Sequence, residues 1–258
     1  MDKKVMFAVA GSGKTSEIIR RLAENKRAII ITYTENNFNH LRSKVIGKFG
    51  YMPKHITVMT YFSFLHSFCY RPLLQQKMKT KGLYLPLPSD KVTRARDKMS
   101  HYRHPSGRLY YNRLAKFLEE TKSHPDVIRR LERFYDQLFV DEVQDFAAND
   151  FNLLMALSPV KADVLFVGDF YQHTFDTSRD GNINCNLHSN IEKYEKRFRD
   201  SGYFVDKKTL KNSWRCGTTV CDFIRANLKI EIFPVKERHT AIIKIEDQVQ
   251  ADVIHRDN

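Results

Sequence analysis

Residues 8 to 15 read AVAGSGKT, and this stretch decides the fold because it follows a short apolar run and precedes a helix-like segment. Gly11 and Gly13 allow backbone amides to surround a polyphosphate, since no Cβ blocks the approach. Lys14 supplies a positive charge for the β- and γ-phosphates, and Thr15 supplies a hydroxyl for Mg²⁺. The pattern predicts a strand, a phosphate-binding loop and a helix whose N-terminus faces the anion.

The usual form of this loop begins with Gly where the chain has Ala8, a small departure because the close phosphate approach falls on the later glycines. The alternative is a Gly-rich turn that binds nothing. The residues expected to hold the nucleotide are Ala10, Gly11, Ser12, Gly13, Lys14 and Thr15. The helix behind the loop is expected over residues 15–24.

The composition fits a protein of one large or two smaller α/β domains. The chain has 258 residues and 42% hydrophobic residues, and no apolar run reaches the ~18 residues that span a bilayer. An export signal would be cleaved through the phosphate loop, so we expect a cytoplasmic protein without a membrane segment. The four cysteines show no Cys-x-x-Cys pair, which favours reduced thiols over zinc ligands.

The net charge of +13 is concentrated in residues 71–125, which hold thirteen Lys or Arg residues against four Asp or Glu residues. A nucleic-acid backbone is the partner that such a segment favours, and Arg94, Arg96 and Lys98 are its candidate contacts. The alternative is a basic surface that only keeps the protein soluble.

Strands and helices are expected to alternate outside residues 71–125, where Pro72, Pro86, Pro88 and Pro105 interrupt the pattern. Strands are expected at 5–9, 28–33, 56–59, 137–140, 164–167 and 241–245, with a strand or loop at 203–210. Helices are expected at 37–49, 61–68, 109–121, 127–135, 150–157, 191–201 and 216–228. This alternation predicts an α/β fold with a parallel, doubly wound sheet, interrupted by a basic, mainly helical insertion.

Two further apolar strands end in polar residues. Residues 138–145 read LFVDEVQD, so Asp141 and Glu142 follow a buried strand, and residues 164–172 read VLFVGDFYQ, which ends in Gln172. The carboxyl ends of parallel strands meet at the ligand-binding edge of such a sheet. Asp141 is then placed to hold Mg²⁺ and Glu142 to take a proton from the attacking water. The alternatives are a solvated acidic loop and a surface glutamine.

Six motifs occur in the order that marks one known family. They are AVAGSGKT, TYTENN (32–37), TYFSF (60–64), VDEVQD (140–145), VGDFYQ (167–172) and SWR (213–215). The set resembles the superfamily 1A DNA helicases of the UvrD, Rep and PcrA type. The resemblance implies a RecA-like motor domain (1A) at 1–70 and 126–225 and a 1B-like insertion at 71–125. Residues 226–258 would be the incomplete start of a second motor domain (2A-like).

The resemblance also implies roles for single residues. Glu142 would be the catalytic base, with Thr15 and Asp141 as metal ligands. Gln172 would sense the γ-phosphate, and Arg215 would be an arginine finger. Trp214 would stack on adenine, with a plain core position as the alternative.

The DNA contacts that the resemblance implies lie in the second and third motifs and just after the fifth. They are Thr32, Tyr33, Asn36, Thr60, Phe62 and Phe175. Aromatic side chains at such positions stack on bases without regard to sequence. A core role is the alternative for Tyr33 and Phe62.

Two departures from the family pattern bear on activity. Only seven residues precede Ala8, so the adenine-reading Gln of the family has no counterpart, and selectivity for ATP over other nucleotides stays open. Thr177 stands where the family has a base-stacking Trp.

The leading hypothesis is a UvrD-type, ATP- and Mg²⁺-dependent helicase or translocase on single-stranded DNA or a single-strand/double-strand junction. The resemblance implies 3′–5′ movement. A second hypothesis is a nucleotide-sensing ATPase subunit that regulates a partner nuclease in an anti-phage (antiviral defence) assembly. A third is a nucleic-acid-binding module whose ATPase has decayed, and the intact motif residues argue against it.

Overall fold

The computed structural model describes residues 2–88, 99–174, 176–178, 182–241 and 245. It divides into two compact units, which are Met1–Ala8 with Gly13–Leu210, and Val9–Ser12 with Lys211–Asn258. After the loop residues, the second unit continues from Lys211, and within it β9 (Asn212–Ser213) pairs with β10 (Phe233–Pro234). Four residues of the phosphate loop group with this unit as well.

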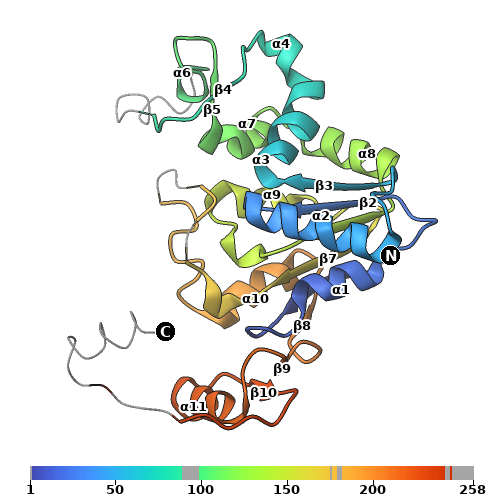
Figure 1. Cartoon of the computed structure of the whole chain (residues 1–258). Helices are drawn as coiled ribbons and strands as arrows, with labels where there is room; N and C mark the ends of the chain where they lie inside the picture. The colour runs from blue at the N-terminus through green and yellow to red at the C-terminus, as the bar shows by residue number, and fades with distance from the viewer. Residues whose placement is uncertain (1, 89–98, 175, 179–181, 242–244, 246–258) are drawn as a thin grey trace. The chain divides into compact units, whose positions relative to one another are not determined.

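The first unit is built on a six-stranded sheet whose strand pairs are all parallel, in the order β3-β2-β6-β7-β1-β8 (Figure 1). Its strands are β1 (Lys3–Phe7), β2 (Ala28–Thr32), β3 (Ile56–Thr60), β6 (Gln137–Val140), β7 (Asp163–Gly168) and β8 (Phe204–Asp206). Four of these strands carry continuous apolar runs, which suits a parallel sheet covered on both faces. The predicted α/β fold with a parallel sheet behind a phosphate loop is confirmed.

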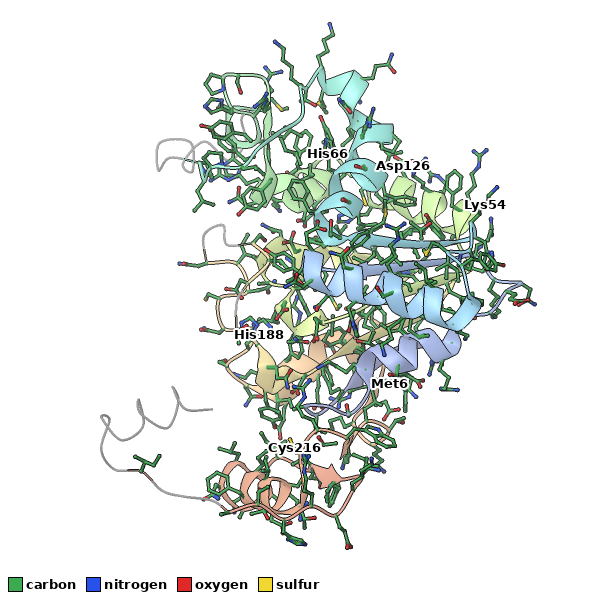
Figure 2. All side chains as sticks on the ribbon, in the orientation of Figure 1. Met6, Lys54, His66, Asp126, His188 and Cys216 are labelled. Atoms are coloured by element: carbon green, nitrogen blue, oxygen red, sulfur yellow. The ribbon has the colours of Figure 1, made fainter. Side chains whose placement is uncertain are left out.

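Alternate residues of the strands enter two separate cores, because successive side chains of a strand point to opposite faces. On β1, Val5 and Phe7 join one buried cluster, whereas Met6, labelled in Figure 2, joins the other. The Met6 cluster is covered by α1 (Lys14–Arg21) and α2 (Glu35–Phe49). Helices α8 (His124–Phe134), α9 (Ala148–Ala156) and α10 (Ile191–Asp200) contribute side chains to the Val5 cluster.

The basic segment does not form a unit of its own. A π-helix, η1 (Phe64–Gln75), runs across its predicted start at residue 71, with Pro72 inside it. The helix expected at 109–121 is α7 (Leu114–Glu120), because residues 109–110 pair as strand β5 with β4 (Leu83–Tyr84). Side chains of this segment, including Phe117, join the same core as the sheet.

The remaining elements are short. They are α3 (Tyr61–Ser63), α4 (Gln76–Met78), α6 (Met99–Tyr102), η2 (Tyr111–Arg113), η3 (Val143–Asp145) and η4 (Phe170–Gln172). In the second unit α11 (Thr218–Leu228) joins β9 and β10, and Val9, Cys221 and Ile232 form its small core. The strand predicted at 241–245 lies largely outside the described residues. No helix in the described ranges is both long and apolar enough to cross a bilayer.

The sheet core gives a stability prediction. Phe166, on β7, is fully buried, so Phe166→Ala is expected to lower the free energy of unfolding by about 3–5 kcal/mol. Phe204 on β8 is 64% exposed, and Phe204→Ala is expected to cost less than about 1 kcal/mol. Urea unfolding followed by circular dichroism measures both. Equal losses in the two variants would contradict the assignment of the core.

Candidate nucleotide-binding site

The loop after β1 has the backbone that its glycines predict. Gly11 has φ 70° and Gly13 has φ 91°, a region that L side chains rarely adopt. Gly13 caps α1, which begins at Lys14, so the first amides of the helix follow the loop directly. The helix ends at Arg21 and not at Glu24, because Leu22 turns to an extended conformation with ψ 138°.

The acidic pair lies beside this loop. The Asp141 N–H donates to the Ile31 carbonyl at 2.8 Å, which fixes the end of β6 against β2. Thr15 Oγ1 donates to Asp141 Oδ2 at 3.3 Å, and Lys14 Nζ lies 3.4 Å from Glu142 Oε2. Residues more than 120 positions apart in the chain are thereby brought into one polar cluster.

The electrostatics of the cluster favour a bound cation. Burial, followed by the neighbouring charge of Glu142, raises the pKa of Asp141 to about 7, while Lys14 and the bond from Thr15 act in the opposite direction. A buried carboxyl group beside a hydroxyl offers the hard oxygen donors that Mg²⁺ prefers. Asp141 and Thr15 therefore fit a magnesium ion.

Glu142 is held in an unusual backbone conformation, with φ 53° and ψ 49°. A non-glycine residue in this region costs about 1–3 kcal/mol and is often found at active sites. The conformation is supported by Gln144, whose Nε2 donates to Glu142 Oε2 at 2.9 Å.

Gln144 is a site residue to which the sequence analysis gave no role, although it lies inside the quoted DEVQD motif. Its Oε1 accepts a hydrogen bond from the Asp169 N–H at 3.0 Å, so one amide joins the end of β6 to the end of β7. A Cβ on Gly168 would lie 2.5 Å from Gln144 Oε1, which explains why glycine stands there.

Gln172 lies in η4, at the same edge of the sheet. Its N–H donates to the Asp169 carbonyl at 3.0 Å, and Asp169 in turn caps the short helix by accepting from the Tyr171 N–H. Because β7 lies between β6 and β1, the loops that carry Gln172, Glu142 and Lys14 follow adjacent strands. Its role as a sensor stays a prediction.

Ala10, Gly11, Ser12, Trp214 and Arg215 lie in the second unit. The Trp214 N–H donates to the Gly11 carbonyl at 2.9 Å, and a Cβ on Gly11 would lie 2.5 Å from Arg215 Cβ. The Trp214 side chain is 66% exposed, which excludes the alternative of a plain core residue. The exposed ring suits a stacking role, which stays a prediction.

Tyr33 and Phe62 line a cavity of about 260 Å³ that also includes Tyr111, Asp150 and Thr177. They reach it from the ends of the neighbouring strands β2 and β3. Phe62 is 40% exposed, whereas Tyr33 is partly buried and packs against the main core cluster.

The other predicted DNA contacts are placed less favourably or lie outside the described residues. Thr32 is fully buried, and Thr60 Oγ1 accepts from the Ser63 N–H to cap α3. Asn36 is exposed on α2. The predicted contacts that lie outside the described residues are Phe175, Arg94, Arg96 and Lys98.

No protein-family model matches the chain, and no curated protein matches it. Solved structures that it resembles include the helicase of PRRSV, at 12% identity and a TM-score of 0.45 over 94% of this chain and 38% of that one. An arterivirus nonstructural protein 10 (helicase) in complex with DNA has 14% identity and a TM-score of 0.47, over 95% of this chain and 44% of that one. Unliganded Pif1 from a Bacteroides species has 14% identity and a TM-score of 0.39, over 88% of this chain and 41% of that one.

The chain thus spans about two fifths of the length of these solved structures. TM-scores below 0.5 are too low to add to the fold assignment, which rests on the strand order and the loop after β1. These two features define the class as an α/β protein of the phosphate-loop type.

Asp150, in the wall of the cavity, gives a pH prediction. Its Oδ1 accepts from the Tyr61 hydroxyl at 2.9 Å, and burial raises its pKa from 3.8 to about 6. The folded state therefore binds the proton of the Asp150 carboxyl group more tightly than the unfolded state does. The stabilisation that this proton adds to the free energy of unfolding is fully present below about pH 4 and is lost as the pH rises through about 6.

Asp150→Asn is expected to remove up to about 3 kcal/mol of this pH dependence. Urea unfolding of both proteins at about pH 4.5 and about pH 7.5 measures it. Relative to the wild type, the Asn variant should gain stability at the higher pH. Asp200→Asn, on an exposed part of α10, is the control, and equal pH slopes in all three proteins would refute the prediction.

Proposed function

We propose that this chain is the nucleotide-hydrolysing motor part of a UvrD-type helicase, driven by ATP and Mg²⁺ along single-stranded DNA. One observation carries the proposal: Lys14 and Thr15 lie against Glu142 and Asp141, 3.4 and 3.3 Å apart. A phosphate-binding loop beside two carboxylates has the parts for transfer of a γ-phosphoryl group to water.

Each of the four side chains has a distinct task in this proposal. Lys14 binds the β- and γ-phosphates, while Thr15 and Asp141 hold Mg²⁺, which neutralises charge on the phosphate oxygens when bound. Glu142 accepts a proton from the attacking water. Because Lys14 is paired with Glu142 before a nucleotide arrives, its move to the phosphates releases the base at the same time.

The surrounding residues orient these four. Gln144 holds the Glu142 carboxylate by a direct hydrogen bond and so acts as a positioning residue. Gln172 is proposed to bond the γ-phosphate or the attacking water, and Arg215 to act as an arginine finger. Both roles rest on the motif resemblance, as does movement in the 3′–5′ direction.

Single-stranded DNA is the proposed polymer because two partly exposed aromatic side chains, Tyr33 and Phe62, line one cavity at the ends of β2 and β3. Stacking of a base on such rings contributes about 1–3 kcal/mol and tolerates any sequence. The basic segment 71–125 adds the charge that a phosphate backbone attracts.

The nucleotide site is tested by Glu142→Gln and Lys14→Ala. Glu142→Gln is expected to lower ATP turnover by about 10²–10⁴-fold with ATP binding retained, because only the base is lost. Lys14→Ala is expected to weaken binding itself, since the phosphate charge loses its partner. Phosphate release and binding of a fluorescent ATP analogue separate the two effects.

Glu120→Gln, on the exposed end of α7, is the matched control and should behave as the wild type. Unchanged turnover in Glu142→Gln would refute the assignment of the base. If the chain binds ATP but DNA does not stimulate its ATP turnover, the nucleotide-sensing subunit is favoured over the translocase.

The DNA surface is tested by Phe62→Ala, which is expected to weaken binding of a fluorescent single-stranded oligonucleotide by about 1–3 kcal/mol. Phe134→Ala is a close control because that ring, on α8, is 41% exposed against 40% for Phe62. Fluorescence anisotropy at fixed low salt measures both. Equal affinities of the two variants for the oligonucleotide would show that this cavity does not bind DNA.

A further inference from the structure

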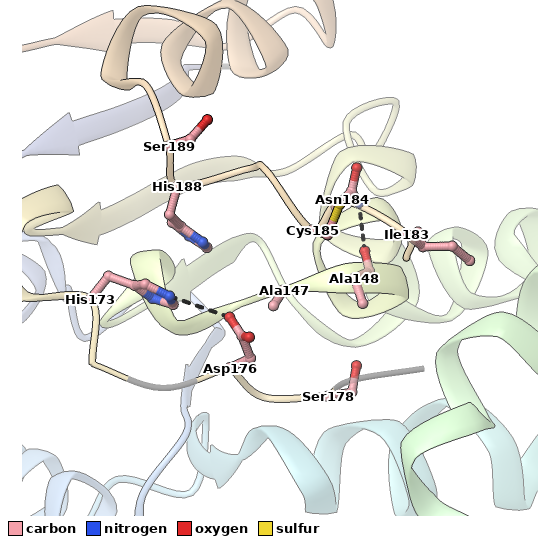
Figure 3. A pocket seen from close by; sticks show the side chains of 10 residues that line it. All are labelled: Ala147, Ala148, His173, Asp176, Ser178, Ile183, Asn184, Cys185, His188 and Ser189. Atoms are coloured by element: carbon pink, nitrogen blue, oxygen red, sulfur yellow. Dashed lines mark hydrogen bonds and ion pairs between the residues drawn. The ribbon is translucent and has the colours of Figure 1, made fainter. Parts of the chain in front are cut away.

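A second polar cluster lies beside a cavity of about 530 Å³, among residues that the proposed function does not use. His173, Asp176 and His188 stand at this cavity, together with Cys185 (Figure 3). His173 follows η4 directly, and His188 precedes α10, so the cluster spans both ends of the connection between the two elements.

The hydrogen bonds of His173 fix its ring. Its Nδ1 lies 2.9 Å from the Gln144 carbonyl oxygen, which only accepts, so Nδ1 carries the proton. Its Nε2 then faces Asp176 Oδ1, 3.3 Å away, where it forms an ion pair when the ring is protonated and can offer its lone pair to a metal ion when the ring is neutral. A backbone carbonyl that orients an imidazole in this way is also the common support of a metal-binding His.

His188 completes the cluster from the other side. Its ring stacks on that of His173 with centroids 3.6 Å apart and an angle of 14° between planes. Its Nε2 is buried and has no hydrogen-bond partner within the described part of the chain. A buried polar nitrogen without a partner costs free energy that a bound ligand can recover.

We propose that His173, Asp176 and His188 bind a divalent transition-metal ion, for which Zn²⁺ is the best fit. Two imidazoles and one carboxylate are ligands that Zn²⁺ accepts, whereas Mg²⁺ and Ca²⁺ take oxygen ligands. Three protein ligands leave a fourth position, and Cys185 lines the same cavity.

The geometry requires a small rearrangement. The three ligand atoms lie within 4.8 Å of one another, whereas tetrahedral ligands at about 2.1 Å from one ion lie roughly 3.4 Å apart. Each lone pair lies in the plane of its ring, so one of the two stacked rings must tilt out of the stack. The adjoining cavity gives His188 the room to do so.

A bound ion would tie the segment after Gln172 to the segment before α10. Because the Gln144 carbonyl holds His173, and the Gln144 amide holds Glu142, the ion would also stiffen the support of the acidic pair. The proposal does not depend on ATP hydrolysis, since the ion is bound by residues outside the phosphate loop.

The test is a Co²⁺ titration of the chelator-treated full chain, without a purification tag and with excess Mg²⁺ to occupy the nucleotide site. Tetrahedral Co²⁺ should give visible absorption that saturates at one ion per chain, and Zn²⁺ should displace it and raise the melting temperature. His188→Ala and Asp176→Asn should each lower the affinity at least tenfold. His40→Ala, exposed on α2, should leave it unchanged.

Asp176→Asn keeps the side-chain shape, so it remains informative if His188→Ala fails to fold, and circular dichroism monitors both. A folded wild-type chain without stoichiometric binding would overturn the proposal. Unchanged affinity in both ligand variants would overturn it as well, whatever the outcome of the ATPase experiments.

Discussion

The interaction on which the site depends is that of Lys14 with several carboxyl groups at the edge of the buried sheet. Gathering these carboxyl groups in one place costs electrostatic free energy. Burial raises the pKa of both Asp141 and Asp145 to about 7, and Lys14 partly offsets that cost. A cluster of this kind lowers stability when no cation completes it, which is the pattern expected of a binding site.

The sheet makes this cluster possible because its strands are parallel. The loops after β1, β6 and β7 all leave the same edge, and each strand is fixed by burial on both faces. The residues of the proposed DNA cavity likewise follow the carboxyl ends of the parallel strands β2 and β3. The nucleotide and the DNA would thus bind to neighbouring loops of one sheet.

The sequence predicted the sheet and the pairing of the loop with Asp141 and Glu142, because apolar strand runs and glycine-rich loops have local signatures. It did not predict the π-helix η1, which contains Pro72. It also gave no role to Gln144 or to the cluster of His173 and His188. Their contacts depend on tertiary packing, and no spacing in the chain encodes them.

The close fit between Gly168 and the Gln144 amide has a consequence for genetics. Any larger residue at 168 would push that amide away and release the glutamate it steadies. Under the proposed function, substitutions there would mimic loss of the Glu142 carboxylate, although the glycine belongs to strand β7 and has no side chain of its own. An inactive variant at this position would therefore show that activity depends on the packing of Gly168 against Gln144.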